Sequence, residues 1–177
     1  MKDKREICVK ENVIYKGKIL SLNADIVKTP NGNESLREIV HHRGGVAVLP
    51  IVKGKIVLVK QYRYAYDEEL FEIPAGKLEE GENPKDAAIR ELHEEVGLLD
   101  ENIISLGEVY PTCGYSNEVI HLYLSKNAKQ VNRHLDEDEF IDVYEFDKET
   151  VMKMIDEGNI KDAKTIIAIY KYFYKED

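Results

Sequence analysis

The chain has 177 residues, of which 43% are hydrophobic and 33% are charged, and its formal net charge is -9. This length predicts one domain with a substantial core, and the composition excludes the disordered and collagen-like classes. The acidic balance argues against a broad nucleic-acid-binding surface, and no apolar run is long enough to span a membrane. The first ten residues are too charged for a signal peptide, so a cytoplasmic protein is expected.

The N-terminal part of the chain predicts antiparallel strands. Residues 12–42 alternate polar and apolar residues around the turn sequence TPNGN, a pattern typical of a long β-hairpin. Two β-branched runs, at 44–52 and 55–62, flank Lys53 and Gly54 and predict a second hairpin with the most buried strands. We therefore expect an N-terminal strand region over residues 1–42 and a second domain over residues 43–177.

The remaining chain predicts one central helix, more strands and a helical tail. Asn83 can cap a helix that begins at Pro84, and Gly97 is suited to end it. Three further strands are expected at 103–110, 119–124 and 139–146, and two helices within 147–174, on either side of Gly158. Strands combined with a central helix and terminal helices predict an α+β sandwich.

The segment 76–98, GKLEEGENPKDAAIRELHEEVGL, contains six glutamates. At helical spacing Glu91, Glu94 and Glu95 share one face, because they are placed at i, i+3 and i+4. A separate apolar stripe, which can be buried, is formed by Ile89, Leu92 and Val96. Like charges at this spacing destabilise a helix by about 0.2–0.5 kcal/mol per pair, so a merely solvated face would gain from lysines. Oxygen ligands of this kind suit Mg²⁺, or Mn²⁺, bound together with phosphate.

The spacing of the whole segment resembles a complete Nudix box, and no position departs from it. Gly76 is followed after five residues by Glu82, after seven more by Arg90-Glu91-Leu92, then by Glu94-Glu95 and Gly97-Leu98, each after one residue. The resemblance implies a Nudix fold, which is an α/β/α sandwich around a mixed sheet, here with an N-terminal antiparallel strand region. It also implies that the box forms a loop, a helix and a loop that support metal ions.

The resemblance assigns roles by position in the box. Glu91 and Glu95 match the principal metal ligands, Glu94 an additional ligand, and Ala75 a ligand through its carbonyl oxygen. Two further residues, Glu82 and Arg90, match an orienting pair. We expect Arg90 to point away from the acidic sector and to brace the glutamates by charge-assisted hydrogen bonds. Bound metal would then neutralise a diphosphate and activate water for attack on phosphorus.

Beyond the box, nearly the whole chain resembles the ADP-ribose pyrophosphatase branch of this family. The similarity is clearest in SLREIVHHRGGVAVLPIV, VKQYRYAYDEELFEIPAGKLEEGE and HLDEDEFIDV. It implies metal-dependent hydrolysis of ADP-ribose to AMP and ribose 5-phosphate by a homodimer that forms through the N-terminal strands. A loop glutamate assists water activation in this branch, and Glu139 is the first candidate here and Glu137 the second. The acidic run that contains them can equally be a solvated turn.

Other charged residues match positions that contact substrate in the branch. Arg63 is the strongest candidate, because an arginine fork suits phosphate. Weaker candidates, which can also be ordinary surface or sheet-edge charges, are Arg37, Glu38 and Glu72. An aromatic side chain such as Tyr15 or Tyr64 could stack on the adenine, but the chain has eleven tyrosines, so the sequence does not decide which of them does.

One departure bears on the substrate. The branch commonly has a proline about fifteen residues after the box, near the distal ribose, and this chain has Cys113 there. Another nucleoside diphosphate conjugate, such as a nucleotide sugar, NADH or a dinucleoside polyphosphate, therefore stays open as the substrate. A non-catalytic ADP-ribose sensor is a second alternative, which the complete set of box carboxylates disfavours. Both cysteines are expected to be reduced thiols, and the histidines have no zinc spacing.

Overall fold

The computed structural model describes residues 3–135 and 139–176. Its internal contacts divide the chain into two compact units. One unit consists of Met1–Gly44 together with Tyr110–Val119, and the other of Gly45–Val109 together with Ile120–Asp177. The N-terminal strands therefore form a unit with a loop from the middle of the chain.

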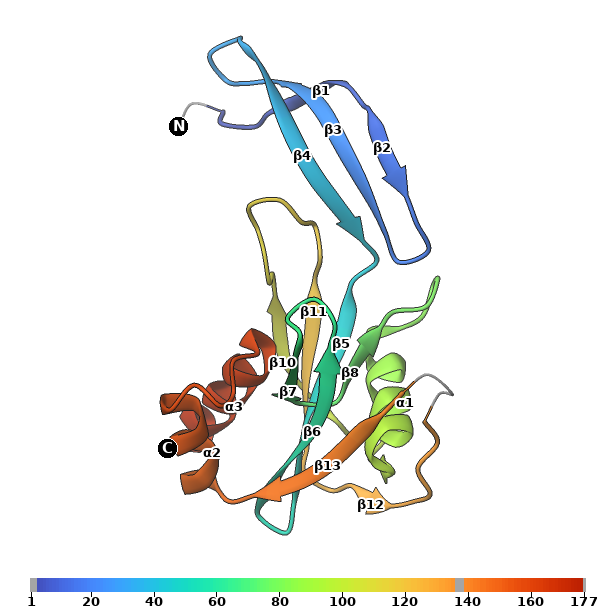
Figure 1. Cartoon of the computed structure of the whole chain (residues 1–177), viewed down its shortest axis with the longest axis vertical. Coiled ribbons are helices and arrows are strands. Elements are labelled where there is room, and N and C mark those ends of the chain that lie inside the picture. The colour runs from blue at the N-terminus through green and yellow to red at the C-terminus, as the bar shows by residue number, and fades with distance from the viewer. Residues whose placement is uncertain (1–2, 136–138, 177) are drawn as a thin grey trace. The chain divides into compact units, whose positions relative to one another are not determined.

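The N-terminal unit is built on a four-stranded antiparallel sheet. Its strands are β1 (Ile7–Lys10), β2 (Val13–Lys16), β3 (Leu20–Lys28) and β4 (Glu34–His42). The first two strands pair with β3 along one edge, and β4 pairs with its other edge (Figure 1). The predicted hairpin is confirmed for β3 and β4 around the TPNGN turn. Its first arm was predicted as one strand, but a turn at Gly17, whose N–H donates to Leu20, splits it into two.

The second unit contains a seven-stranded mixed sheet. Its main strand order is β10 (Ile104–Val109), β11 (Ile120–Ser125), β5 (Gly45–Val52), β6 (Lys55–Arg63) and β13 (Ile141–Phe146). Two short strands join it, β7 (Glu68–Glu72) on β6 and β8 (Ala75–Lys77) on β5. The β5–β11 pairing is parallel and the others are antiparallel, so the sheet is mixed. A separate pair consists of β9 (Leu98–Leu99) and β12 (Lys129–Gln130).

The β5–β6 hairpin is fixed by its turn. Lys53 and Gly54 both have positive φ, at 51° and 79°, as a two-residue turn matched to the strand twist requires. The two strands flanking this turn are among the most buried in the unit, as predicted. The hairpin therefore forms the centre of the sheet.

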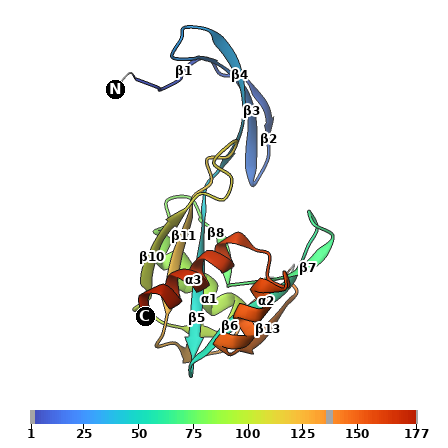
Figure 2. The same ribbon diagram turned by 90° about the vertical axis from the view of Figure 1, so that its left-hand side faces the viewer.

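Helices cover both faces of this sheet. Helix α1 (Pro84–Val96) lies on one side, and α2 (Lys148–Asp156) and α3 (Ala163–Glu176) lie on the other (Figure 1; Figure 2). Alternate residues of β5 face the two layers, because Val46 and Val48 pack with α1 while Ala47 and Leu49 pack with α2 and α3. The predicted α/β/α sandwich is confirmed.

Two general features complete the description. Within the described residues, no helix has both the length and the apolar character needed to cross a membrane. Cys8 and Cys113 are both free and exposed, which confirms the prediction of unpaired thiols.

Candidate active site

Local sequence fixes the ends of helix α1. The Asn83 side chain accepts a hydrogen bond from the Lys85 N–H at 2.9 Å, and Pro84 occupies the first turn. Gly97 ends the helix in the left-handed conformation, at φ 65° and ψ 38°. Both ends are as predicted, so the position of every glutamate along the helix follows from the sequence.

Packing then fixes the rotation of α1. Ala87, Ala88, Leu92 and Val96 are buried against the sheet, while Ile89 is only partly buried. At about 25 cal/mol per Å² of buried apolar surface, a stripe of this kind contributes several kcal/mol. The acidic residues are consequently held in one orientation by the hydrophobic core.

Two of the three glutamates on this helix are buried. Glu91 is 7% exposed and Glu95 is 2% exposed, whereas the side chain of Glu94 is 34% exposed. The shared face predicted for the three glutamates is therefore covered at Glu91 and Glu95. The cause is β8, which packs against α1 and whose Ala75 N–H donates to Glu95 Oε2 at 3.0 Å.

Gly76 makes room for the first of these carboxylates. A Cβ atom added at Gly76 would overlap the carboxylate of Glu91. The first glycine of the box is thus explained by a close approach of β8 to a helix side chain. Any larger residue would displace the Glu91 carboxylate.

Arg90 gathers the box carboxylates. Its Nε and Nη2 donate to the two oxygens of Glu82 at 3.0 and 3.1 Å, and Nη1 donates to Glu91 at 2.8 Å and Glu94 at 2.9 Å. The expectation that Arg90 points away from the acidic sector is wrong, because its long side chain folds back along the helix. The expected bracing by charge-assisted hydrogen bonds is present.

Burial perturbs the acidity of this site. Desolvation raises the pKa of Glu91, although the charge and hydrogen bond of Arg90 oppose the rise. Desolvation also raises the pKa of Glu95, to about 8, and the charges of Glu91, Glu139 and Glu72 add to the effect, while the Ala75 N–H opposes it. Negative charge on these two carboxylates is therefore costly until a cation is present.

The donor set fits a hard divalent cation. Within the described residues, no three His, Cys, Asp or Glu side chains are gathered closely enough to hold a metal. In this arrangement Arg90 donates to Glu91 and Glu94, while Glu95 accepts from the Ala75 N–H. Carboxylate and carbonyl oxygens are nevertheless the ligands that Mg²⁺ and Mn²⁺ prefer. Burial raises the pKa of Glu91 and Glu95, and a bound divalent cation would favour the charged form of both carboxylates.

The two candidates for the loop glutamate have different outcomes. Glu139 is partly buried, and its charge raises the pKa of both Glu91 and Glu95, so it belongs to the same electrostatic site. Glu137 lies outside the described residues. The choice between the two therefore stays a prediction.

The substrate-contact candidates are divided between the two units. Arg63 and Glu72 pair through Nε to Oε1 at 2.5 Å and Nη2 to Oε2 at 2.7 Å. This pair is in the unit that contains the box. The hydrogen bonds that Arg63 donates to Glu72 raise the pKa of Arg63, and the charge of Glu95 adds to the rise. Arg37 and Glu38 are in the N-terminal unit, where Arg37 pairs with Glu6 at 2.5 Å.

The sequence did not predict two groups beside Arg63. Lys164 donates to Glu72 Oε2 at 2.5 Å and pairs with Asp162 at 2.9 Å. These residues are 92 and 90 positions from Glu72, so no spacing in the sequence connects them. The one usable signal was the sequence Asp162-Ala-Lys-Thr165 before an apolar helix, which is typical of an N-cap.

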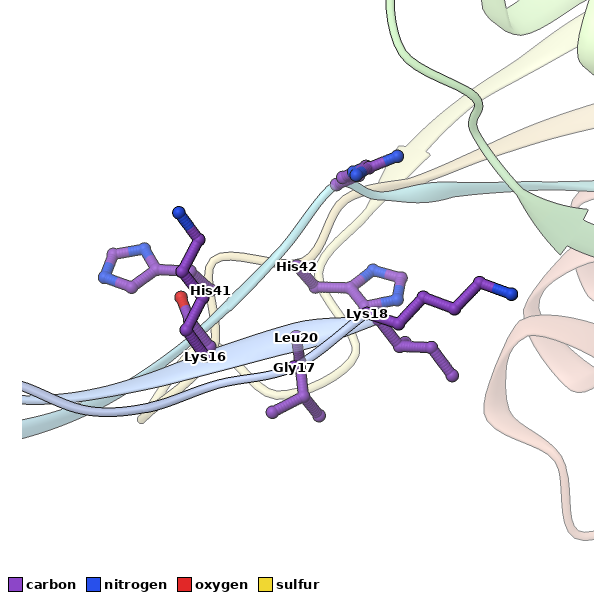
Figure 3. A pocket seen from close by; sticks show the side chains of 9 residues that line it. Lys16, Gly17, Lys18, Leu20, His41 and His42 are labelled. Carbon is purple, nitrogen blue, oxygen red and sulfur yellow. The ribbon is translucent and has the colours of Figure 1, made fainter.

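A second set of basic side chains surrounds a cavity in the N-terminal unit. The cavity has a volume of about 260 Å³ and is formed by the β2–β3 turn and the end of β4 (Figure 3). Its basic and histidine side chains are those of Lys16, Lys18, His41, His42 and Arg43. Among the residues described, no acidic side chain lines this cavity. It is a cationic site within a protein of net charge -9.

Comparison with known proteins identifies the family. The family described as NUDIX domain matches residues 41–168, which include the complete box. The chain therefore belongs to the Nudix family, and the predicted family and enzyme class, a hydrolase, are confirmed.

Two relatives match almost the whole chain. The "ADP-ribose pyrophosphatase" of Bacillus subtilis is 40% identical, over 99% of this chain and 97% of the relative. The "Methanol dehydrogenase activator" of Bacillus methanolicus is 43% identical, over 93% of this chain and 90% of the relative. A solved structure described as an "ADP compounds hydrolase" superposes with a TM-score of 0.86 at 17% identity, covering 97% of this chain and 94% of that chain. The last similarity supports the fold alone.

Proposed function

We propose that this protein hydrolyses the diphosphate bond of ADP-ribose to AMP and ribose 5-phosphate with a divalent metal ion. The observation that carries the proposal is the pair of buried carboxylates of Glu91 and Glu95. They are held on α1 beside β8, and a bound cation would compensate for the burial of their charge. A relative named ADP-ribose pyrophosphatase, similar over 99% of this chain, supports ADP-ribose as the substrate.

The box residues are assigned as follows. Glu91, Glu95 and the carbonyl oxygen of Ala75 would hold the metal, and Glu94 would contribute to a second ion. When bound, a divalent cation neutralises the diphosphate and acidifies a water molecule. Arg90 orients Glu91 and Glu94 while its opposite edge is fixed by Glu82, so the carboxylates keep their spacing. Mg²⁺ is proposed as the physiological ion and Mn²⁺ as a substitute.

Glu139 is proposed to accept the proton of the attacking water. Its effect on the pKa values of Glu91 and Glu95 supports this assignment, because a base must lie near the water that it deprotonates. Glu137 stays the second candidate. The variants Glu139→Gln and Glu137→Gln distinguish the two candidates, because only the variant that lacks the base should have a lower kcat at saturating metal and substrate.

Substrate contacts are proposed for two pairs of residues. The side chain of Arg63 is 39% exposed and is held by Glu72 through Nε and Nη2, so its Nη1 edge is placed to donate to a polar or anionic group. Arg37 and Glu38 are proposed to contribute from the N-terminal unit.

We also propose a cytoplasmic homodimer that forms through residues 1–42. Every residue of β1 and β2 is exposed, and the exposed apolar side chains include Ile7, Val9, Val13, Ile14 and Tyr15. An apolar surface on these strands favours burial against a partner. The same strands of a second copy present an equally apolar surface, which could cover this one.

Product analysis tests the hydrolase proposal. Purified protein is incubated with ADP-ribose, NADH, ADP-glucose, a diadenosine polyphosphate or a nucleoside triphosphate, each with Mg²⁺ and with EDTA. AMP and ribose 5-phosphate should form fastest from ADP-ribose and only with metal. Faster cleavage of another conjugate would replace the substrate, and binding of ADP-ribose without cleavage would favour the sensor alternative. The protein is also added to a methanol dehydrogenase, and the rate of methanol oxidation tests the activity named for the second relative.

Light scattering after size-exclusion chromatography tests the dimer. The wild type should have twice the monomer mass, and Val13→Asp should shift it toward the monomer because it places a charge on the apolar strands. Ile104→Asp, at a residue 50% exposed on β10, is the matched control and should leave the mass unchanged. A monomeric wild type at micromolar concentration would contradict the proposal.

A further inference from the structure

A cavity of about 290 Å³ lies between the tip of the β6–β7 hairpin and the start of α3. The hairpin contributes two strongly exposed aromatic side chains, Tyr64 at 90% and Tyr66 at 71%. The polar part of the lining consists of Arg63, Glu72, Asp162 and Lys164. Two cations and two carboxylates thus form a chain along one side of the cavity.

Glu72 is the buried centre of this chain. It is 3% exposed, and its two oxygens accept from Arg63, while Oε2 also accepts from Lys164 at 2.5 Å. Burial alone would raise the pKa of Glu72, but the hydrogen bonds and charges of Arg63 and Lys164 lower it below its ordinary value. The carboxylate is therefore charged and held by two cations.

Lys164 is itself fixed by the first turn of α3. Its side chain is 12% exposed and pairs with Asp162, which caps the helix by accepting from the Thr165 N–H at 3.0 Å. Thr165 Oγ1 in turn accepts from the Ile73 N–H at 2.8 Å, next to Glu72 in the chain. The start of α3 is thus tied to the end of β7, beside Glu72.

Arg63 keeps one edge of its guanidinium available. Its Nε and Nη2 donate to Glu72, and within the described residues Nη1 donates no hydrogen bond to the protein. The residue also lines the cavity. The available edge is suited to a phosphate or another acceptor group of a ligand.

We infer that Lys164 is a positioning residue that acts through Glu72 to aim the Nη1 edge of Arg63 at the substrate. The inference rests on the proposed function, in which Arg63 contacts a nucleoside diphosphate conjugate. Lys164 takes up part of the negative charge of Glu72, so Arg63 keeps more of its own charge for the ligand. It also holds the Glu72 carboxylate in the orientation that fixes the arginine fork.

Removing Lys164 leaves Glu72 with one cation and one fewer hydrogen bond. A buried charged group that loses a partner reorients or takes up a proton, and either response releases Arg63 from its fixed direction. Binding should weaken, whereas the chemical step, which depends on the α1 carboxylates, should be nearly unchanged. Lys164→Met should raise KM for ADP-ribose by roughly fivefold and change kcat by less than about twofold.

A double-mutant cycle tests whether the effect passes through Arg63. ADP-ribose is titrated calorimetrically in EDTA into the wild type, Lys164→Met, Arg63→Met and the double variant, and steady-state kinetics are measured with Mg²⁺. Lys164→Met should weaken binding in the wild-type background and have no further effect beside Arg63→Met. Lys164→Arg should restore most of the affinity, because it keeps the charge and a donor.

Lys161→Met is the matched control. Lys161 pairs with exposed Glu68 at 2.9 Å near the same helix and is itself 55% exposed, so its loss should change neither binding nor turnover. Thermal unfolding of each variant checks the fold, and Lys164→Gln replaces Lys164→Met if the latter does not fold. An equal loss from Lys164→Met in both backgrounds would overturn the inference. A wild type that binds ADP-ribose but does not cleave it with Mg²⁺ would overturn only the hydrolase proposal, and one that neither binds nor cleaves it would overturn both.

Discussion

The larger unit contains two networks of charged side chains, which differ in their ratio of cations to carboxylates. At α1 a single arginine, Arg90, donates to three carboxylates. A fourth carboxylate, Glu95, lies beside them and, among the residues that the structure describes, accepts only from the Ala75 N–H. Around Glu72 two cations, Arg63 and Lys164, share one buried carboxylate, and Asp162 balances the second cation. The first network has an excess of negative charge and the second is balanced.

This difference indicates what each network does. Buried carboxylates without enough cations are stabilised by a bound metal, so the α1 network is suited to catalysis. A balanced network satisfies its own charges and can hold one arginine edge in a fixed direction. We therefore assign the chemical step to the residues of α1 and substrate affinity to the residues around Glu72.

The largest expected effect is that of Glu95→Gln. Removing a metal-binding charge should lower kcat by about a thousandfold or more at saturating Mg²⁺, since the variant keeps the shape of the side chain but not its charge. The measurement is the rate of AMP formation from ADP-ribose. Glu80→Gln, at an exposed box position, is the control and should retain activity. Near wild-type turnover of Glu95→Gln would refute the ligand assignment.

Gly76→Ala should have the next largest effect. The added Cβ overlaps the Glu91 carboxylate, so that side chain must leave its place beside β8. We expect activity to fall by roughly a hundredfold and the Mg²⁺ concentration for half-maximal rate to rise. An unchanged metal dependence would mean that Glu91 is not held for the metal.

Arg90→Lys should lower activity by about tenfold. A lysine keeps the charge but cannot donate to Glu82, Glu91 and Glu94 at once, as the guanidinium does. Both kcat and the metal dependence should change, while KM changes little. Activity equal to the wild type would show that charge alone organises the carboxylates.

The smallest expected effect is on stability, and its sign is opposite to that on activity. The pKa of folded Glu95 is about 8, above its ordinary value of 4.5, so the folded state retains a proton that the unfolded state loses. The metal-free protein should therefore lose stability as pH rises from about 5 to above 8. At pH 6 Glu95→Gln should be more stable than the wild type by on the order of 2 kcal/mol, and at pH 4 nearly equal.

Denaturant unfolding in EDTA at both pH values measures this difference. Added Mg²⁺ should then stabilise the wild type more than the variant. A wild type whose stability does not fall with pH would contradict the burial cost assigned to Glu95.

Local patterns explain which parts of the fold could be predicted. Asn83, Pro84 and Gly97 define α1 through contacts within one turn of themselves, and Lys53-Gly54 defines its hairpin in the same way. Strands β7 and β8 were not predicted, because EELFE and AGK have weak strand patterns and depend on pairing with β6 and β5. Their existence follows from tertiary contacts.

The candidate active site, like the fold, was predictable only where local sequence patterns determine it. Helical periodicity placed Glu91, Glu94 and Glu95 together, but it could not show that β8 covers two of them, since β8 comes from outside the helix. The direction of Arg90 was missed because a long side chain can fold toward either neighbour. The N-cap pattern that begins at Asp162 indicates a helix start but could not connect Lys164 to Glu72, which is 92 residues away.

Direct titration of metal ions into the protein tests the central claim that the α1 carboxylates form a cation site. Mn²⁺ is titrated calorimetrically into the wild type, Glu95→Gln and Glu80→Gln, without substrate. We expect Mn²⁺ to bind to the wild type and to Glu80→Gln, and to bind to Glu95→Gln with an affinity at least about tenfold weaker. Equal Mn²⁺ affinity in all three proteins would contradict this claim.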